Sequence, residues 1–509
     1  MQRDRFRFSQ RGGWARGGAV TPPERKSVSL ISANVTQVAP GKASVRLLAR
    51  NDAQTTHAEY QTRIELPEGV FVTGLRLKIG DDFVPGKLFD RKTAMWVYQK
   101  ITEVRRDPAL LVYHSPNALE LRVYPFPAQG EREVELDFAF PSGAKANIDL
   151  DGRHIELNSN VGTPFQHAGD YLTLLGDSAL PTFTRKPYLH LVLDYSLGKG
   201  NLAQEYSERI AAIAEKLGIS DIRLTVANLR DADLNNGELL DATDSGKIRK
   251  LLADPGIPRA HGFWAERVIR KKILAHAESV TQGNFQRVPV FVLMSASSLD
   301  RQEFAALPFQ SLAFVSPDVD TWYLDQSGKL ARYSLTGEQM EVLSPQLAPL
   351  HVFKRGTHVA LLGERATLAV LPGNEPLEHF DGQAFQPMPE RDVANPGLEW
   401  EKRAGLWRQW REAMLDPAQM EQRRAALLEA ARAQDTLIPS AAFIVVESTD
   451  QSKILERKEA ESLANQDALA FEEKKPPEPS AWLMFALVLG LIFWSRRRKH
   501  SSSAHPQDM

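Results

Sequence analysis

Apolar and polar residues alternate in short runs through residues 30–150 of the chain. In Glu131–Phe140 the acidic residues take one set of alternate positions, and the large apolar residues take the other. Val70–Ile79 has a similar two-residue period, which is typical of strands with one buried face. Between these runs, apolar residues recur at helical spacing from Ala94 to Ile101. The pattern therefore predicts an N-terminal β-sandwich over residues 30–150 that carries one short helix.

The pattern changes over residues 185–320, where apolar runs alternate with amphipathic segments. The predicted strands are Tyr188–Leu193, Ile222–Val226, Val288–Met294 and Leu312–Val315. The predicted helices are Leu202–Leu217, which Gly218 ends, and Ala265–Val280. This order of elements predicts a doubly wound α/β domain, in which ligands bind at the carboxyl ends of the strands.

Residues 321–465 are expected to close the globular part with strand hairpins followed by helices. Trp322–Leu324 and Leu330–Tyr333 flank a turn that contains Gly328, as in a hairpin. The proline-rich residues 372–396 indicate a linker or an ordered wrap. Helices are predicted over Leu398–Leu415, Gln419–Ala433 and Gln451–Leu463. We expect the tryptophans of the first of these helices to lie in the core, because helical aromatic residues usually do.

The two ends of the chain differ from this globular pattern. Residues 1–29 are rich in Arg and Gly and lack the apolar core of a secretory signal. We expect a disordered basic leader there, or a start inside a longer protein. Residues 466–480 form a polar, proline-rich spacer, residues 481–495 are almost entirely apolar, and residues 496–509 begin with a basic cluster.

The apolar run near the C-terminus predicts a transmembrane helix over residues 481–495. As a helix the run Ala481–Trp494 rises about 21 Å, whereas the hydrocarbon core of a bilayer is about 30 Å thick. Trp482 and Trp494 suit the membrane interfaces, and flanking Lys and Arg side chains can snorkel to lengthen the span. The basic cluster would stay cytoplasmic, so we expect a single-pass inner-membrane protein with its globular part on the periplasmic side.

Composition and charge remove several classes of function. The chain has 62 Lys+Arg against 64 Asp+Glu, so its charge does not favour binding of nucleic acid. It has no cysteine, which excludes disulfides, thiolate metal sites and thiol nucleophiles. The sequence also lacks a phosphate-binding loop, a nucleophile elbow and a zinc-protease motif. We therefore predict a protein that is not an enzyme and needs no cofactor.

Asp194 and Ser196 follow the first predicted strand of the α/β domain. In position and spacing they resemble the first metal-binding motif of a von Willebrand A domain, Asp-x-Ser-x-Ser, which implies oxygen ligands for Mg²⁺. This copy departs from that pattern, because Gly198 replaces the second serine and the strand through Leu293–Ser297 lacks the usual aspartate. Thr243 is the candidate for the middle ligand. Two interpretations stay open, a metal-free structural domain and a working Mg²⁺ site.

A second resemblance covers nearly all of residues 30–142. Its motifs, in order, are Leu66–Val70, Gly74-Leu75, Ala94, Val97-Tyr98, Asp107–Leu111 and Arg122–Phe126. They resemble a VIT domain, the N-terminal domain of inter-alpha-trypsin inhibitor heavy chains and of many bacterial proteins. Leu437–Glu447 resembles the strand that closes the globular part after the A domain in that family. The resemblance implies an interaction-type protein with a VIT domain and an A-like domain.

The C-terminus carries a third resemblance. Its parts are Pro477, Glu478 and Pro479, then the apolar helix, then Arg496, Arg497 and Arg498. This order resembles the PEP-CTERM sorting signal of Gram-negative bacteria, which implies recognition by an exosortase on the way to the envelope exterior. Two features depart from the pattern: SSSAHPQDM follows the arginines, and the secretory signal is missing. The combination also resembles the VIT proteins associated with exosortase systems, many of which carry membrane helices ahead of the VIT domain.

These observations predict a non-enzymatic envelope protein, anchored in the inner membrane or sorted to the surface, that acts through protein–protein contacts or as a scaffold. The expected partners are an exosortase-type processing enzyme, the inner membrane and an extracytoplasmic protein, and no nucleic acid. One alternative is a Mg²⁺-dependent adhesin that uses Asp194, Ser196 and Thr243. The other is a hydrolase without a recognisable motif.

Overall fold

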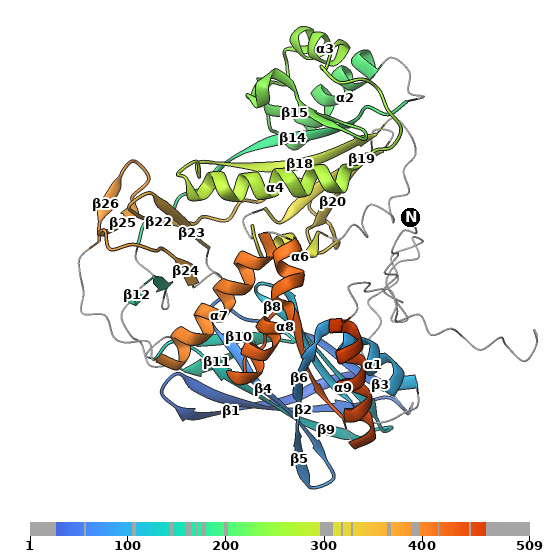
Figure 1. Ribbon diagram of the computed structural model, residues 1–509, viewed down its shortest axis with the longest axis vertical. Helices are drawn as coiled ribbons and strands as arrows, with labels where there is room; N and C mark the ends of the chain where they lie inside the picture. Colours follow the sequence, from blue (N-terminus) through green and yellow to red (C-terminus); the bar gives the residue numbers. More distant parts are fainter. Residues whose placement is uncertain are drawn as a thin grey trace, which may run out of the picture. The chain divides into compact units, whose positions relative to one another are not determined.

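The computed structural model describes residues 27–464, apart from several short gaps (Figure 1). The gaps are residues 55–57, 104–107, 143–145, 159–164, 169, 175–179, 198–201, 296–308, 317–318, 327–328, 364–367, 389–397, 416 and 447–448. Most of the predicted basic leader, and all of the spacer 466–480, the helix 481–495 and the tail 496–509, lie outside the described residues. Among the helices that are described, none is both long and apolar enough to cross a membrane. Glu24–Glu456 form one compact unit, to which the following description refers.

Two antiparallel sheets form the predicted N-terminal sandwich, which is confirmed. One has the order β1-β2-β9-β4-β5, with β1 (Val28–Ala39), β2 (Lys42–Asn51), β4 (Phe71–Ile79), β5 (Asp82–Pro85) and β9 (Glu131–Ala139). The alternation in β9 places Val134, Leu136 and Phe138 in the core, each less than 4% exposed. The helix expected near Ala94 is α1 (Arg91–Glu103).

The second sheet of the sandwich has the order β11-β10-β3-β8-β7-β27-β6. Its strands are β3 (Ala58–Glu65), β6 (Lys87–Asp90), β7 (Ala109–Ser115), β8 (Ala118–Phe126), β10 (Ala146–Leu150), β11 (Arg153–Asn158) and β27 (Ala441–Val445). The last of these comes from the far end of the globular chain. Phe443 pairs with Leu111 of β7 on one side and with Leu88 of β6 on the other. The closing strand expected over Leu437–Glu447 is therefore an interior strand of this sheet, between β7 and the edge strand β6.

The α/β domain is built on parallel strands. Its strands are β14 (Lys186–Asp194), β15 (Asp221–Ala227), β16 (Asp231–Asp233), β17 (Leu240–Asp241), β18 (Arg287–Ser295), β19 (Thr321–Gln326), β20 (Lys329–Ser334) and β21 (Gln339–Met340). Its helices are α2 (Leu202–Leu217), the 3-10 turn η1 (Leu234–Gly237), α3 (Ser245–Ala253), α4 (Ala265–Thr281) and α6 (Gln310–Ala313). The order β16-β15-β14-β18-β19-β20-β21 has its four central strands parallel.

Helices cover both faces of this sheet, as a doubly wound domain requires. Leu189, Leu191 and Leu193 of β14 pack in one cluster with residues of α2 and α3. Val192 packs on the opposite face with residues of α4 (Figure 1). The predicted doubly wound α/β architecture is confirmed.

One predicted strand of the α/β domain is wrong. Leu312–Val315 lies in α6 and the turn after it, and the fourth parallel strand is β19, which pairs with β18. A run of four apolar residues is too short to show either a helical or a strand period. A buried strand and a buried helical turn would both place apolar side chains such as Leu312 in the core, where Phe309 also lies. The hairpin expected around Gly328 is confirmed as β19–β20, and it extends the sheet beyond residue 320.

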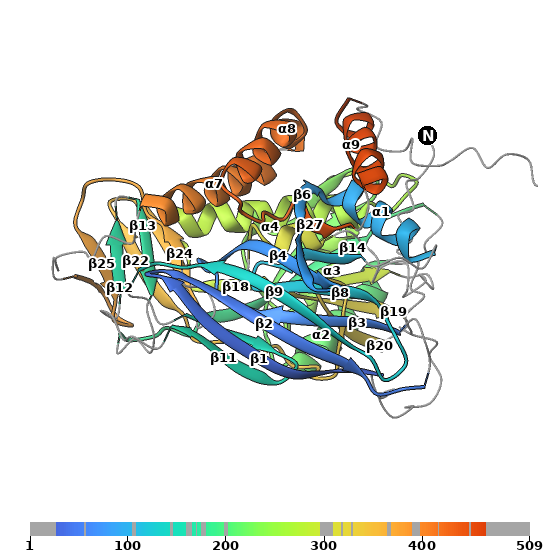
Figure 2. The same ribbon diagram turned by 90° about the horizontal axis from the view of Figure 1, so that it is seen from below.

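Two smaller sheets and a helical segment complete the globular part. One sheet holds β12 (Phe165–Ala168), β13 (Tyr171–Leu174) and β24 (Leu368–Val370), and the other holds β22 (His351–Arg355), β23 (His358–Leu362), β25 (Leu377–Phe380) and β26 (Phe385–Pro387). The helices are α7 (Leu398–Leu415), α8 (Pro417–Ala433) and α9 (Thr449–Ala464), with α7 and α8 packed as a hairpin (Figure 2). The residues predicted for the first of these helices are helical throughout α7, and the described part of the chain stops directly on either side of it.

The tryptophans of α7 lie in the core, as expected. Trp407 is 3% exposed, and its ring centroid lies 5.1 Å from that of Tyr113 in the sandwich and 6.3 Å from that of Phe314 after α6. Trp410 lies 5.1 Å from Phe314. Trp400 donates its indole hydrogen to the carbonyl of Gly69 at 2.8 Å. This helix therefore packs against both the sandwich and the α/β domain.

A buried ion pair joins α8 to the sandwich. Arg424 donates to Oδ1 of Asp90 from Nε at 3.0 Å and from Nη2 at 2.6 Å, and Oδ2 of Asp90 accepts from the amide of Thr93 at the start of α1. We predict that Arg424→Ala lowers the free energy of unfolding by about 3–5 kcal/mol, because it leaves the Asp90 carboxylate buried without its charge partner. A urea titration followed by circular dichroism measures this change.

The matched control for this prediction is Arg423→Ala. Arg423 is the preceding residue of α8 and is exposed, so its removal should change the free energy of unfolding by less than about 0.5 kcal/mol. Equal effects of the two substitutions would contradict the role of the ion pair.

Candidate interaction site at the carboxyl edge of the α/β sheet

Asp194 ends β14 at the carboxyl edge of the parallel sheet and is 2% exposed. Its Oδ1 accepts a hydrogen bond from the amide of Ser196 at 3.0 Å, and its Oδ2 accepts one from the hydroxyl of Ser295 at 2.8 Å. Its backbone carbonyl accepts from the hydroxyl of Tyr206 in α2 at 2.9 Å. The carboxylate therefore fastens the ends of β14 and β18 to each other. Asp194 and Ser196 are brought together as the sequence indicates.

A guanidinium group lies at the same edge. Arg209 of α2 donates from Nε to Oδ2 of Asp325 at 3.0 Å and from Nη1 to the carbonyl of Ser295 at 3.2 Å. The Asp325 side chain is 1% exposed. Ser295 is the last residue of β18, and Asp325 is the second-last residue of β19, the neighbouring parallel strand. Their positions at the ends of strands are the sequence feature that could have identified them as site residues. No sequence pattern marks Arg209, whose role depends on how α2 packs.

The structure does not bring Thr243, the predicted middle ligand, beside Asp194 and Ser196. It follows β17, which pairs with the first residues of β15, whereas Asp194 is level with Ala227, the last residue of β15. A strand of that length separates the two positions by about 20 Å. The Thr243 hydroxyl instead donates to Oδ1 of Asp241 at 2.7 Å, in the turn that leads into α3.

The described residues do not fit a Mg²⁺ site. The ion prefers several carboxylate and other oxygen ligands, yet both oxygens of Asp194 already accept hydrogen bonds and Asp325 is paired with Arg209. In this part of the chain no three His, Asp or Glu side chains are grouped so that they could hold a metal ion. Gly198, which replaces the second serine of the motif, lies outside the described residues. A fixed positive charge at the edge would also repel a second cation.

Three loops bring apolar side chains to the surface beside this edge. Leu197 is 45% exposed, Leu229 is 55% exposed and Trp264 is 55% exposed. The amide of Leu197 donates to the carbonyl of Ala260 at 3.0 Å, in the loop that leads to Trp264. The side chain of Asn228 donates to the carbonyls of Tyr195 and Pro258 at 3.2 and 2.9 Å, which ties all three loops together.

Arginine side chains stand among these apolar residues. Arg230 is exposed, Arg259 lies 5.1 Å from the centre of the Tyr195 ring, and Arg267 of α4 donates to the carbonyl of Leu229 at 3.1 Å. We refer to this surface as the carboxyl rim, which consists of Leu197, Leu229, Arg230, Arg259, Trp264 and Arg267. It combines apolar and positively charged groups at the edge where α/β domains bind their ligands.

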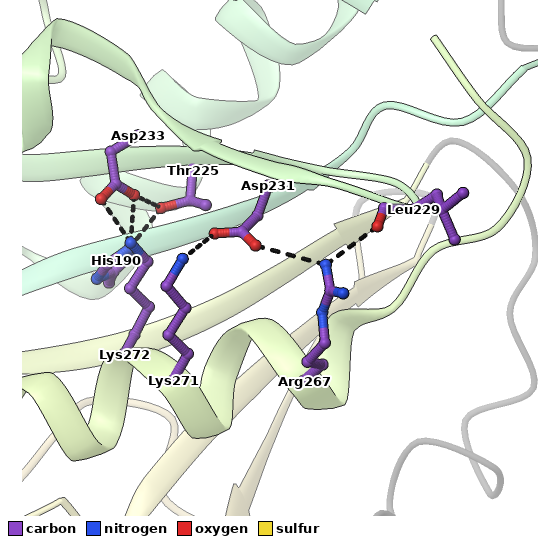
Figure 3. Close-up of polar contacts among 8 residues, drawn as sticks. All are labelled: His190, Thr225, Leu229, Asp231, Asp233, Arg267, Lys271 and Lys272. Carbon is purple, nitrogen blue, oxygen red and sulfur yellow. Dashed lines mark hydrogen bonds and ion pairs between the residues drawn. The ribbon is translucent and has the colours of Figure 1, made fainter. Parts of the chain in front are cut away.

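A row of polar contacts leads from the rim into the domain (Figure 3). Lys271 of α4 donates to Oδ2 of Asp231 at 2.8 Å, and Lys272 donates to Oδ1 of Asp233 at 2.6 Å. The hydroxyl of Thr225 also donates to Oδ1 of Asp233, at 2.6 Å. His190 lies behind it, with Nε2 2.8 Å from the Thr225 hydroxyl oxygen.

This row contains a hydroxyl, an imidazole and a carboxylate, but not in the order that catalysis requires. Thr225 gives its one hydrogen to Asp233, so its oxygen accepts from His190, whose Nε2 then carries a hydrogen. The imidazole cannot act as a base toward a hydroxyl to which it donates. Thr225 is 0% exposed and His190 is 2% exposed, so a substrate cannot reach them. The row is structural.

Burial sets the protonation of this row. Burial lowers the pKa of His190 to about 3, with further contributions from the charges of Lys272 and Arg223. Burial alone would raise the pKa of Asp233, but the hydrogen bonds from Lys272 and Thr225 outweigh it and lower that pKa. His190 is therefore neutral and Asp233 is charged in the folded protein at neutral pH.

We predict that protonation of His190 destabilises the fold in mild acid. Its pKa rises to about 6.5 on unfolding, so the unfolded chain binds the proton first, and the stability present above pH 6.5 is lost as the pH falls toward 3. Between pH 7 and pH 5 the loss from this residue is about 2 kcal/mol. Urea titrations at the two pH values measure it. His190→Gln should remove about that much of the pH dependence, because the amide can still donate to Thr225 and cannot titrate.

His358→Gln is the control for the pH prediction, since His358 is exposed at the start of β23. It should leave the difference between the two pH values unchanged. If His190→Gln behaves like His358→Gln, the buried imidazole is not the origin of the acid sensitivity.

The fold defines a class of protein with a β-sandwich and an α/β domain, and the carboxyl rim is exposed on the α/β domain. The comparison with protein families identifies the first part, because residues 32–138 match the VIT family, described as the vault protein inter-alpha-trypsin domain. The VIT domain predicted from the sequence is thus confirmed. No curated protein matches the chain.

Two solved structures show a weak likeness to the chain. A von Willebrand factor type A protein from Catenulispora acidiphila is 10% identical with a TM-score of 0.20, and the match covers 56% of this chain and 89% of that chain. A GH20 exo-β-N-acetylglucosaminidase from Vibrio harveyi, in an inactive form, is 9% identical with a TM-score of 0.14, over 52% of this chain and 46% of that chain. These scores add nothing to the α/β architecture, which stands on the strand order of the sheet.

Proposed function

We propose that this chain is a non-enzymatic interaction protein that binds a protein partner through the carboxyl rim without a divalent cation. The observation that carries the proposal is the position of Arg209, whose guanidinium pairs with Asp325 at the edge where a metal would otherwise be expected. A metal-free edge still offers a surface, because Leu197, Leu229 and Trp264 remain exposed beside it.

The charges of the rim indicate the chemistry of the partner. Arg230 and Arg267 are exposed, and Arg259 is half-buried against Tyr195. The nearby acid Asp231 is paired with Lys271 at 2.8 Å and with Arg267 of the rim at 3.5 Å, so one carboxylate faces two of these cations. The surface is therefore positive, and a partner that combines acidic and apolar side chains would suit it.

The proposal extends to the place of the protein in the cell. The support comes from the sequence of the tail, in which Pro477, Glu478 and Pro479 precede an apolar run, and Arg496, Arg497 and Arg498 follow it. We propose that residues 481–495 anchor the protein in the inner membrane, with the globular part on the periplasmic side, and that an exosortase-type enzyme recognises the tail. A scaffold role in a PEP-CTERM system follows from this arrangement.

The rim makes a direct prediction for partner binding. The double variant Leu229→Ser, Trp264→Ser and the unchanged chain are each crosslinked in the native envelope. The variant should capture about one tenth as much partner or less. The reason is that loss of the two apolar contacts should cost at least about 1.4 kcal/mol of binding free energy, which weakens binding tenfold. Added salt should weaken the binding, and a chelator of divalent cations should leave it unchanged. Quantitative mass spectrometry of the captured proteins measures all three effects.

Val342→Ser is the control for the rim. Val342 is 47% exposed after β21 and is not part of the rim, so the same substitution there should not change capture. Loss of capture with the chelator, restored by Mg²⁺ and abolished by Asp194→Ala, would support the metal-dependent adhesin in place of this proposal.

The tail makes a separate prediction. Deletion of residues 477–500 should move the protein from the membrane pellet to the soluble fraction, because the deletion removes the apolar run and the basic cluster together. Immunoblots of fractionated cells measure this. Replacement of Arg496, Arg497 and Arg498 by Gln is the matched variant: it should keep the protein in the membrane and alter its processing. An unchanged distribution after the deletion would contradict the anchor.

A further inference from the structure

β1 is an edge strand of the sandwich with unusual composition. It forms one border of its sheet, and among the described strands it pairs with β2 alone; in Figure 2 it lies at the margin of the sandwich, beside β11 of the other sheet. None of its 12 residues is charged, and Asn34–Val38 are all exposed. Val35 is 37% exposed and Val38 is 64% exposed. Proteins normally protect such an edge with charges or prolines, because its free backbone groups can pair with another strand.

The other border of the same sheet is protected in that way. β5 has four residues, begins with the acidic Asp82 and ends with Pro85, which cannot donate a backbone hydrogen bond. At the start of β1 the Arg153 side chain donates to the carbonyls of Leu30 and Ile31 at 2.9 and 3.0 Å. Within the part of the chain that the structure describes, the edge that stays open is therefore Ser32–Val38, which we call the open edge.

We propose that the open edge pairs with the open edge of a second copy of this chain, antiparallel and with Val35 on the two-fold axis. The two sheets then join into one sheet across the dimer. A second copy fits because the segment is uncharged and so meets no like charge when it faces itself. Since β5 is protected, the pairing joins the same edge of both copies and closes after two.

The absence of cysteine from the chain allows a clean test by crosslinking. Residues directly opposite in an antiparallel pair have Cα atoms about 4.5–5.5 Å apart, which a disulfide can span. Val35→Cys in the full chain, in mild detergent, should form a disulfide-linked dimer under oxidation. The reaction should be at least about tenfold faster than for Asp82→Cys on the protected edge, since pairing holds the two thiols at millimolar effective concentration.

The register has its own test. Asn34→Cys mixed with Thr36→Cys should crosslink as a hetero-pair faster than either variant does alone, because the symmetry places residue 34 opposite residue 36. Charge provides a second, independent measurement by sedimentation. Val35→Lys should be a monomer by itself, as should Val35→Glu, and a mixture of the two should restore the dimer. Circular dichroism of each variant shows whether the sandwich is still folded.

Two results would overturn the proposal. One is a monomeric sedimentation coefficient for the unchanged chain in the concentration range where Val35→Cys is tested. The other is crosslinking of Val35→Cys at the same rate as Asp82→Cys, which would mean random collision or association through another part of the chain. In either case the open edge does not pair with itself, and a strand of a different protein is the remaining occupant.

Discussion

The insertion of β27 between β7 and β6 is the constraint on which the rest of the structure depends. All five residues of Ala441–Val445 are buried, and the strand is apolar on both faces. Without it, β6 and β7 would each present a row of unpaired backbone groups inside a sheet, which is costly away from water. Because the strand follows the α/β domain, the chain must leave the sandwich after β11 and return to it. The α/β domain is in effect a large insertion in the connection between two strands of one sheet.

The return path explains why α7 and α8 are so well anchored. Trp400 and Trp407 bind the turn before β4, through the carbonyl of Gly69 and the carboxylate of Glu68 at 2.8 and 3.0 Å. Arg424 pairs with Asp90 just before α1, and the amide of Leu437 donates to the carbonyl of Val72 at 2.9 Å. These contacts follow one another along the chain and hold the segment before β27 against the sandwich, up to the point where β27 pairs with β7. The region that matches the VIT family, residues 32–138, therefore depends on residues beyond position 400 to complete its sheet.

The parts that could be predicted from the sequence are those with a local physical cause. The two-residue period of β9 and the apolar stripe of α4 each follow from one buried face, and Gly218 ends α2 with φ of +69°, a conformation that favours glycine. The failures concern contacts between distant segments. Leu312–Val315 has no period long enough to separate helix from strand. The role of Thr243 could not be decided without the pairing of β17, which places it at the opposite edge of the sheet from Asp194.

The difference between local patterns and contacts of distant segments also explains why the sequence identified only some of the polar residues at the carboxyl edge. Asp194 and Ser196 stand two residues apart, so a motif can show them, whereas Asp325 and Arg209 meet only because α2 packs across the ends of β18 and β19. An arginine keeps its charge at any physiological pH and cannot dissociate, unlike a bound ion. Under the proposed function, the Arg209 charge takes the role of a cation at this edge, and recognition of a partner depends on shape, apolar contact and the surrounding arginines, which are the groups that the rim presents.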